Sequence, residues 1–583
     1  MNEERLRDAQ SLYGEILALD PRHAPAWHGL ALLARATGAA GAELALLDRA
    51  VRSAPESADL RLEYATVLER QGELEGAERQ LTDVCRRRPD SAALWQALGI
   101  ARQTLGETAA AREAYRRACM LEPGAERQLK LATLLSPVAG SRESIATERG
   151  EIETAMDAIL AGPPKDLGDP MRSSPWPHFY SAYHAESNRT LHTKEAAMYR
   201  HLFPSLDYIA PHCRGRSRVG ERIRVGLISQ FFRDHSIGRT SRGFFSQLDR
   251  GPFEVTAIFI PPAVDDAYAR FIRAHADRSI DLPADLAAAR SLIAQARLDV
   301  LFYQDIGMEP FSYFLAFARL APVQCVSFGH PDTTGVATMD YFVSNDWYET
   351  RDAANHYSER LFTLHGLPTL AYYFRPERSP ARHERESFGL ARERHVYLCP
   401  QNLFKLHPDM DALVAEILRR DPQGELVAIE GRIGHWTGLL RRRWAAAMPD
   451  VMERVRFLPR MDSQRYVDLI ACADVMLDTP HFNGMNTSLE ALAVGTCVVT
   501  WPGEFQRGRH TQAMYRAMDL DDGVVDSARA YVERALELGT DAARRDTLSR
   551  KIRDRSRALF EDARVVREFE RFFRAAVEMG TPA

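Results

Sequence analysis

The stretch LDTPHFNGMNTSLEAL, residues 477–492, decides the fold class. It begins at the end of the apolar run 475–477, which is typical of a strand buried on both faces of a sheet. A loop with Gly484 comes next, and we expect a helix to begin near Thr487. A strand, a glycine loop and a helix in this order form the repeating unit of a doubly wound parallel sheet.

The same alternation extends over most of the chain. We predict strands at residues 223–229, 253–260, 298–303, 323–328, 395–398, 425–429, 455–458, 475–477 and 497–500. Their number suits two sheets, divided near the polar, proline-bearing segment 375–392. The sequence therefore predicts an α/β protein with two Rossmann-like domains facing a cleft, at residues 216–385 and 386–555. A helical connector at 136–215 precedes them, and a C-terminal helix within 556–583 is expected to fold back onto the first sheet.

The first 135 residues contain a repeat. Prolines recur every 34 residues, and so do glycines, at Pro21, Pro55, Pro89, Pro123, Gly38, Gly72 and Gly106. This period is that of the tetratricopeptide repeat, which has two antiparallel helices per unit. We predict an α-solenoid at 1–135, with a half repeat and then three full repeats over about 24–125. Its concave face would bind a protein or peptide; the alternative is a packing or dimerisation module.

Composition limits the classes of function. Of 583 residues, 75 are Lys or Arg and 80 are Asp or Glu, so the net charge of −5 provides no footprint for nucleic-acid binding. No apolar run approaches the roughly 18 residues of a membrane span, and residues 1–7 have no apolar core, so we expect no secretory signal. The seven cysteines form no CxxC pair, which fits a reducing compartment. We expect a soluble, cytoplasmic protein without nucleic-acid or membrane partners.

The helix expected after Gly484 is a candidate phosphate site. Free backbone N–H groups and the helix dipole favour an anion there, and Thr487 and Ser488 add hydroxyl donors. Glu490 could accept hydrogen bonds from the hydroxyls of a ribose. The alternative is structural, because residues 487–490 also form a capping-box pattern.

Three other loops follow predicted strands. Lys405, one of only five lysines, lies in CPQNLFKLHP (399–408), where an ammonium could neutralise a leaving diphosphate or merely be solvated. His235 precedes a helix expected from about Ser241, and it could bind an acceptor or a sugar, or be structural. The loop GHPDTTG (329–335) permits close approach of a ligand, but it is also consistent with a plain turn.

Several ordered motifs together resemble glycosyltransferase family 41 over about the last 400 residues. They are RVGLIS (224–229) with His235, RLAPVQ (319–324) before GHPDTTG, MDY (339–341), NLFK (402–405), ADVMLDTP (473–480) with NG (483–484), and VTWPGE (499–504). That family includes O-GlcNAc transferases, Spindly-type protein O-fucosyltransferases and bacterial cytoplasmic N-glucosyltransferases. Tetratricopeptide repeats before such a region are the usual order in the O-GlcNAc transferases.

The resemblance implies an inverting transferase of the GT-B type that needs no metal or other cofactor. His235 matches the family's active-site histidine, and Lys405 matches its diphosphate-binding lysine. Asn402 stands near the diphosphate, where the family often has glutamine. Gly329 and Pro331 would line the sugar pocket.

The resemblance also implies which residues would contact the nucleotide. Thr487 lies in the family's pyrophosphate-binding helix start, Glu490 matches an acidic ribose ligand, and Tyr466 would flank the nucleobase. We also include in the predicted donor site the neighbours of Thr487, which are Asn483, Gly484, Asn486 and Ser488.

Departures from the family pattern keep the donor sugar open. Residues 485–487 read MNT where O-GlcNAc transferases commonly have His-Thr-Thr, and Glu490 replaces the usual aspartate, as in Spindly-type enzymes. The loops at 235–240 and 329–331 are closer to the N-glucosyltransferases. We expect a protein glycosyltransferase that moves GlcNAc or glucose from a UDP-sugar to Ser/Thr or Asn. The alternatives are transfer of fucose from GDP-fucose or of another hexose, and an inactive repeat-based adaptor.

Overall fold

A computed structural model describes residues 3–173, 177–215, 221–378 and 382–579 of the protein. Contacts divide the chain into two compact units, residues 1–136 and 137–583. The division falls one residue beyond the predicted end of the repeat array. In the part of the chain that is described, no helix is both long enough and apolar enough to cross a membrane.

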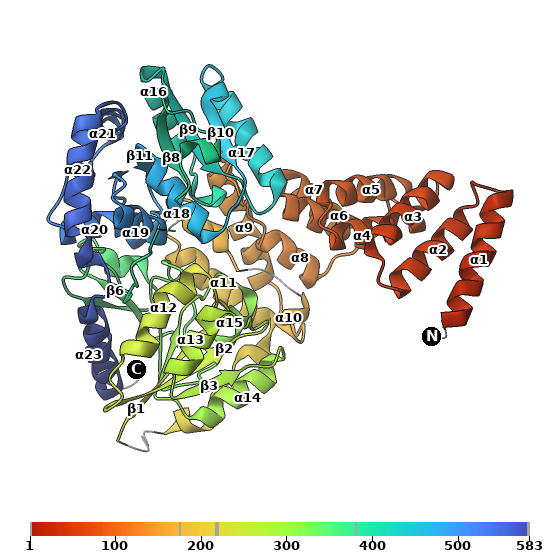
Figure 1. Ribbon diagram of the computed structural model, residues 1–583. Helices are drawn as coiled ribbons and strands as arrows, with labels where there is room; N and C mark the ends of the chain where they lie inside the picture. The colour runs from red at the N-terminus through yellow and green to blue at the C-terminus, as the bar shows by residue number, and fades with distance from the viewer. Residues whose placement is uncertain (1–2, 174–176, 216–220, 379–381, 580–583) are drawn as a thin grey trace. The chain divides into compact units, whose positions relative to one another are not determined.

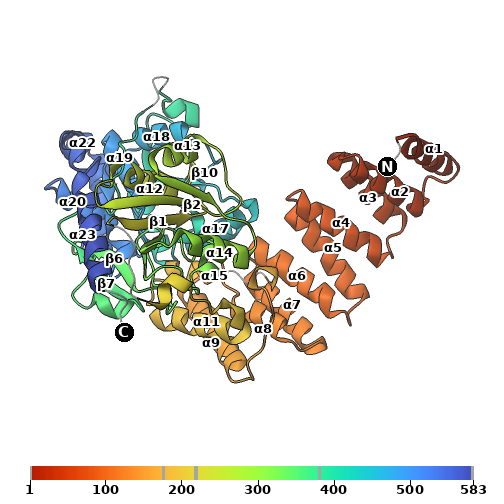
Figure 2. The ribbon, with the colours of Figure 1, turned by 90° about the horizontal axis from the view of Figure 1, so that it is seen from below.

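The first unit is an array of antiparallel helix pairs, which confirms the predicted solenoid (Figure 2). Its helices are α1 (Glu3–Leu19), α2 (Ala24–Ala36), α3 (Ala40–Ser53), α4 (Ala58–Arg70), α5 (Leu74–Arg87), α6 (Ala92–Leu105), α7 (Thr108–Leu121) and α8 (Ala125–Ala132). The recurring glycines Gly38, Gly72 and Gly106 have φ of +74°, +81° and +82°, a left-handed conformation that glycine adopts without strain. They therefore mark the turns between paired helices, as the period predicts.

The second unit opens with a helical connector, which includes α9 (Arg142–Leu160) and α11 (Arg189–Leu202). A seven-stranded parallel sheet follows, in the order β3-β2-β1-β4-β5-β6-β7. Its strands are β1 (Ile223–Ser229), β2 (Phe253–Phe259), β3 (Arg278–Asp281), β4 (Val300–Tyr303), β5 (Val323–Val326), β6 (Tyr341–Asn345) and β7 (Arg360–Leu364). The sequence analysis missed β3, β6 and β7. Of these, β3 and β7 are sheet edges whose side chains, apart from that of Leu364, are exposed or half-buried, so neither strand has the apolar run of a strand buried on both faces.

The second sheet has five parallel strands in the order β10-β9-β8-β11-β12. They are β8 (His395–Cys399), β9 (Gly424–Ile429), β10 (Val455–Leu458), β11 (Val475–Leu477) and β12 (Val498–Val499). The helices used below are α12 (Ser236–Gln247), α16 (Asp409–Arg420), α18 (Ser463–Cys472), α19 (Met485–Val494), α20 (His510–Ala517), α21 (Ala528–Thr540) and α23 (Ala563–Met579). Two doubly wound sheets confirm the predicted fold class (Figure 1).

The C-terminal helix α23 crosses back to the first sheet, as predicted. The ring of Phe569 lies 4.9 Å from that of Phe244 on α12 and 5.4 Å from that of Phe302 on β4. Two predicted helix starts were wrong. Helix α12 begins at Ser236, five residues before the expected Ser241, and α19 begins at Met485, two residues before Thr487.

A buried ion pair ties the two sheets together. Arg507, in the segment after β12, is 3% exposed, and its Nη1 lies 3.4 Å from Oδ1 of Asp332 in the loop after β5. Arg507 also donates to the carbonyl of Glu186 at 2.6 Å, and Asn188 donates to Asp332 at 2.5 Å. Burial by itself would raise the pKa of Asp332, but Arg507 and these polar neighbours hold it below its usual value. The pair therefore joins the connector and both sheets.

Substitution Arg507→Met should strongly destabilise the second unit, because it leaves the Asp332 carboxylate buried without its charge partner. We expect the free energy of unfolding to fall by about 3–5 kcal/mol. Chemical denaturation of the full chain, with calorimetry to resolve the two units, measures the loss. Arg419→Met removes an exposed ion pair with Asp450 and is the control, which should leave unfolding nearly unchanged. Equal behaviour of the two variants would contradict the role given to Arg507.

Candidate active site

The site forms around Asp478, a fully buried carboxylate immediately after β11. Its Oδ1 accepts the backbone N–H of Gly484 at 2.8 Å. Its Oδ2 accepts the hydroxyls of Thr500 at 2.9 Å and Thr511 at 2.6 Å. These bonds hold the loop so that Gly484 caps the start of α19 without a side-chain cap. The first N–H groups of α19 therefore stay available to an anion.

The capping-box interpretation of residues 487–490 is wrong. Thr487 is the third residue of α19 rather than its cap, so its hydroxyl cannot play the capping role. Instead its Oγ1 lies 3.2 Å from the hydroxyl of Tyr466, a residue of α18. The Tyr466 hydroxyl also donates to the carbonyl of Pro400 at 3.1 Å. The structure thus brings the predicted pyrophosphate and nucleobase residues together. Their roles stay predictions.

Lys405 lies beside the first turn of α19; we call this place, formed by Asn483, Gly484 and the start of α19, the corner. It ends a short 3₁₀ turn, and its Nζ donates to the backbone carbonyl of Asn483 at 2.9 Å and lies 4.7 Å from the centre of the Phe482 ring. Burial lowers the pKa of Lys405 to about 8, and the nearby Asp478 carboxylate opposes that shift. A half-buried ammonium and a helix N-terminus therefore meet at Asn483, and their binding of a diphosphate stays a prediction.

Glu490 is already in an ion pair. Its Oε1 accepts a hydrogen bond from Nη1 of Arg239 at 2.9 Å, and Arg239 lies on α12, a helix of the domain that contains the first sheet. Arg239 also pairs with Asp234. Burial raises the pKa of Glu490 to about 7, while Arg239 opposes the shift. The sequence analysis did not assign Arg239 a role, although it lies four residues after His235 in a loop already singled out.

His235 is the N-cap of α12. Its Nδ1 accepts the backbone N–H of Ile237 at 3.2 Å, and its ring stacks on Phe231 at 4.4 Å. A ring nitrogen that accepts this bond carries no proton, so the neutral imidazole carries its proton on Nε2. Burial, together with Arg233 and Arg239, lowers the pKa of His235 to about 4. At neutral pH His235 is therefore an uncharged ring with an N–H donor.

The loop that begins at Gly329 is tightly packed. A side chain at Gly329 would place Cβ 1.8 Å from the carbonyl oxygen of Gln304, so only glycine fits there. Pro331 is buried, and His330 stacks on Phe179 at 5.1 Å. Packing alone accounts for these residues, so their place in a sugar pocket stays a prediction.

The other predicted residues differ in accessibility. Ser488 is fully buried. Its Oγ lies 2.8 Å from the hydroxyl of Thr511, so this side chain is enclosed in the protein and is not exposed to a ligand. Asn483 is buried and donates to the carbonyl of Thr479. Asn486 is half-buried, and its Oδ1 has no hydrogen-bond partner among the described residues. Asn402 is exposed.

Two further polar side chains lie near this corner, and the sequence analysis assigned neither. Gln401 immediately precedes Asn402, in a loop where only the asparagine and the lysine drew attention. His510 begins α20 and is 1% exposed, and within the described chain neither ring nitrogen has a hydrogen-bond partner. Burial and the nearby Lys405 lower the pKa of His510 to about 3. No pattern at the single position 510 distinguishes such a histidine from a structural one.

A group of three side chains has the chemistry of a metal site. Ligand atoms of His407, Asp409 and His481 lie within 4.8 Å of one another. Both carboxylate oxygens of Asp409, however, already accept hydrogen bonds from the Arg142 guanidinium. His407 Nδ1 also accepts the backbone N–H of Asp409 at 3.2 Å. A cation at this site would therefore have to displace Arg142.

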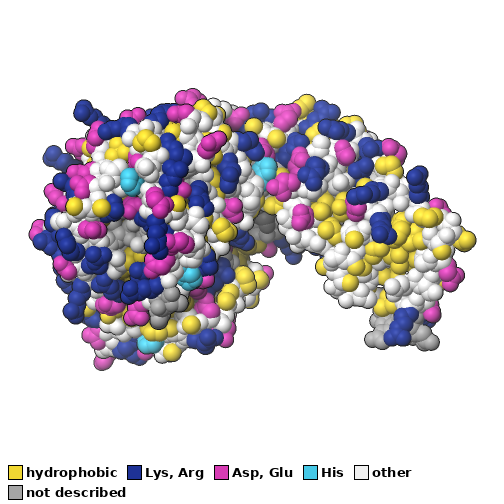
Figure 3. All heavy atoms as spheres, turned by 45° about the horizontal axis from the view of Figure 1, so that its top comes forward, with side chains coloured by type: hydrophobic (Ala, Val, Ile, Leu, Met, Phe, Trp, Pro, Cys, Tyr) yellow, Lys and Arg dark blue, Asp and Glu magenta, His cyan; other side chains and the backbone are white. Residues whose placement is uncertain are grey.

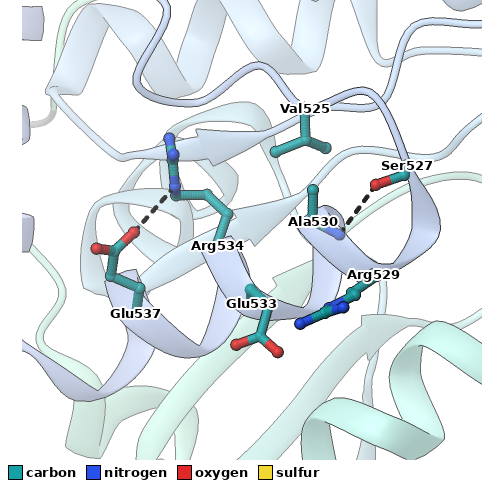
Figure 4. A pocket seen from close by; sticks show the side chains of 7 residues that line it. All are labelled: Val525, Ser527, Arg529, Ala530, Glu533, Arg534 and Glu537. Carbon is teal, nitrogen blue, oxygen red and sulfur yellow. Dashed lines mark hydrogen bonds and ion pairs between the residues drawn. The ribbon is translucent and has the colours of Figure 1, made fainter.

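An open hollow of about 320 Å³ lies along α21 and is separate from this corner (Figure 4). Three of the charged side chains that line it are paired: Arg534 lies 3.0 Å from Glu537, and Glu533 is bonded to Arg420. It holds none of the predicted site residues.

Comparisons with known proteins identify the family of the chain. Residues 205–367 and 376–567 match the model of Glycosyl transferase family 41. The chain belongs to this family. Residues 35–102 match a tetratricopeptide repeat model. A solved O-GlcNAc transferase mutant of Thermobaculum terrenum has a TM-score of 0.65 and 22% identity, covering 95% of this chain and 98% of that chain, which shows a shared fold.

Two relatives carry activities in their names. A probable UDP-N-acetylglucosamine–peptide N-acetylglucosaminyltransferase SEC of Arabidopsis thaliana is 24% identical over 362 residues, 60% of this chain and 37% of the relative. A UDP-glucose:protein N-beta-glucosyltransferase of Actinobacillus pleuropneumoniae is 23% identical over 357 residues, 58% and 53% respectively. The chain thus matches about a third to a half of the length of these two relatives.

The lowered pKa of Lys405 predicts a pH dependence for nucleotide binding. The ammonium is present below its pKa of about 8 and is lost above it, so affinity for UDP or GDP should be constant near neutral pH and fall as pH rises through that value. Titration calorimetry from about pH 7 to about pH 9.5 measures the change. Lys405→Arg keeps a charged group throughout this range and is the control. A wild-type affinity that stays level up to the highest pH would contradict the assignment.

Proposed function

We propose that this family 41 chain is an inverting, metal-independent protein glycosyltransferase. It moves GlcNAc or glucose from a UDP-sugar to a Ser, Thr or Asn side chain of a protein acceptor. The observation that carries the proposal is the convergence of the Lys405 ammonium and the start of α19 at Asn483. A fixed cation and free N–H groups at this corner suit a departing diphosphate, and they supply the charge that a metal ion provides in other transferases.

The reaction is a direct displacement. The acceptor oxygen or nitrogen forms a bond to the anomeric carbon as the bond from that carbon to the diphosphate oxygen breaks, which inverts the configuration. Negative charge develops on the leaving nucleoside diphosphate, where Lys405 and α19 stabilise it. Removal of one such contact typically slows a reaction by about 10²–10³-fold.

His235 acts in this scheme as a hydrogen-bond donor. Because its Nδ1 is engaged by the N–H of Ile237, the Nε2–H can orient the acceptor or the sugar but cannot remove a proton in the same tautomer. The proton of the acceptor therefore leaves by another route, and we assign no side chain of this site as a general base.

The repeat unit supports a protein acceptor. It exposes large apolar side chains, among them Leu32 at 42% and Ile100 at 41%. These two positions are 68 residues, or two repeats, apart, so they are equivalent places in the solenoid. Hydrophobic side chains gather on the visible face of the repeats (Figure 3). Such a surface fits a peptide or protein partner.

The donor class follows from the relatives and from the site. The names of the two relatives specify UDP-GlcNAc and UDP-glucose, which we propose as donors here. Glu490 stands where the family usually has aspartate, as in Spindly-type enzymes, so GDP-fucose is the second candidate donor. An inactive adaptor would not need the half-buried Lys405 beside α19. The seven cysteines of the described chain are free thiols, which supports a cytoplasmic location.

Transfer assays with UDP-GlcNAc, UDP-glucose and GDP-fucose test the proposal. We expect turnover with a UDP-sugar that is unchanged by EDTA, because Lys405 and α19 serve in place of a metal. Mass spectrometry of an acceptor protein after co-expression identifies the added sugar and the modified residue. Lys405→Ala should abolish transfer while the protein still folds. Loss of turnover in EDTA, or normal transfer by the alanine variant, would refute this mechanism.

Substitution of His235 distinguishes a role as hydrogen-bond donor from a role as general base. Gln can present an N–H near the position of Nε2 but cannot remove a proton, so His235→Gln should keep much of kcat. His235→Ala loses both the donor and the cap of α12 and should be far slower. Steady-state kinetics with saturating donor gives both values, and thermal unfolding controls for the lost cap. If Gln is as damaging as Ala at equal stability, His235 is the base.

A further inference from the structure

Two histidines and one aspartate gather outside the predicted donor site. Asp409 begins α16, His407 precedes it by two residues, and His481 lies in the loop between β11 and α19. Nε2 of His481 lies 2.8 Å from Oδ2 of Asp409, and Nδ1 of His407 lies 3.3 Å from Oδ1 of the same carboxylate. The fold therefore brings two imidazoles to one carboxylate from segments that are 72 residues apart in the chain.

The separations of these atoms suit a transition metal. Bonds from zinc to imidazole nitrogen and carboxylate oxygen are about 2.0–2.2 Å long, so the ligand atoms of a tetrahedral site lie about 3.3–3.5 Å apart. The three side chains offer ligand atoms that all lie within 4.8 Å of one another, so small side-chain rotations bring them to such distances. Two imidazoles with one carboxylate favour zinc over magnesium or calcium, which prefer oxygen ligands.

A cation of the chain itself already binds this carboxylate. Arg142, at the start of α9, donates from Nη2 to Oδ2 of Asp409 at 2.6 Å, and its Nε donates to Oδ1. The side chain of Arg142 is 71% exposed, whereas that of Asp409 is 13% exposed. Exposed ion pairs contribute little to stability, so the guanidinium can turn into solvent at low cost. Arg142 is therefore a displaceable cation on a largely enclosed carboxylate.

His481 holds its place in the group with a strained backbone. Its φ is +67°, in the left-handed region that residues other than glycine and asparagine rarely adopt. Such strain persists where the surroundings fix a residue, and it is concentrated at functional sites. From this conformation the ring of His481 contacts Asp409 and packs edge to face on His407, with the ring centres 4.8 Å apart.

We infer that His407, Asp409 and His481 form a binding site for Zn²⁺, and that the Arg142 guanidinium competes with the ion for Asp409. On binding, zinc replaces the guanidinium at the carboxylate and the N–H of Asp409 at Nδ1 of His407. It also replaces the proton on Nε2 of His481, which shifts to Nδ1 of that ring. Water completes the four ligands.

The ion takes no part in the proposed transfer reaction, which proceeds without a metal. It would instead join the start of α16 to the loop before α19, the segment that also contains Asn483 and Gly484. Zinc binding is therefore a property of this chain that is independent of the donor sugar and of the acceptor.

Zinc titrations of wild type, Arg142→Ala and His481→Asn test the inference. Loss of a residue that only supports a metal ligand typically weakens binding by 10–100-fold, so loss of the His481 ligand itself should weaken it by at least about 100-fold. Asparagine tolerates the left-handed backbone but supplies no imidazole. Arg142→Ala removes the competitor and should tighten binding by about 3- to 10-fold. Titration calorimetry with ZnCl₂ measures both changes, and MgCl₂ should show no binding.

Two exposed pairs elsewhere in the chain provide matched controls. Arg419→Ala removes an arginine that donates two hydrogen bonds to Asp450, and His365→Asn removes a histidine beside Asp346. Both variants should bind zinc as wild type does. Cobalt in place of zinc reports the kind of ligand, because thiolate ligands add a charge-transfer band to its spectrum that imidazole and carboxylate do not.

Several results would overturn the inference. They are no zinc binding by either wild type or Arg142→Ala, wild-type affinity in His481→Asn, a thiolate band in the cobalt spectrum, and Arg142→Ala binding zinc no more tightly than Arg419→Ala. Thermal unfolding without zinc shows whether each variant folds. If His481→Asn does not fold, the comparison of Arg142→Ala with Arg419→Ala decides the question by itself.

Discussion

The arrangement of the site depends on the buried carboxylate of Asp478. It is fully enclosed at the end of β11, and one carboxylate accepts bonds from Gly484, Thr500 and Thr511. Burial raises the pKa of Asp478, and these donors together with Lys405 oppose the rise. The same group therefore fixes the loop before α19, ties it to α20, and stabilises the ammonium on its other side. A polar network of this kind specifies a geometry because each member has its partners only in that geometry.

Contacts between the two sheets place the rest of the site. Arg239 on α12 pairs with Glu490 on α19, and Arg507 after β12 pairs with Asp332 after β5. Both pairs connect segments that follow the carboxyl ends of parallel strands, where ligands bind in folds of this class. The first pair has a direct consequence for chemistry, because the predicted ribose ligand already has a cationic partner that a nucleotide would have to share or displace.

The histidines of this region show how backbone geometry selects chemistry. His235 caps α12 through Nδ1, which leaves an N–H on Nε2, and burial keeps the ring uncharged. His510 is uncharged for the same reason, with Lys405 adding to the effect. Residue type alone permits an acid, a base, a metal ligand or a core residue at each position. Only the partners of the two ring nitrogens distinguish these roles.

The sequence by itself determined the repeat array, the two parallel sheets and the approximate place of the site. The period of 34, the buried strand runs and the loop at 477–492 are local patterns, and local patterns survive in a single sequence. It did not identify the edge strands β3 and β7, the true start of α19, or the pairing of Arg239 with Glu490. It also could not tell that Gln401 is buried against Gly484 while Asn402 is exposed. These features arise from contacts between residues far apart in the chain, and burial and hydrogen bonding there are decided only when the tertiary structure forms.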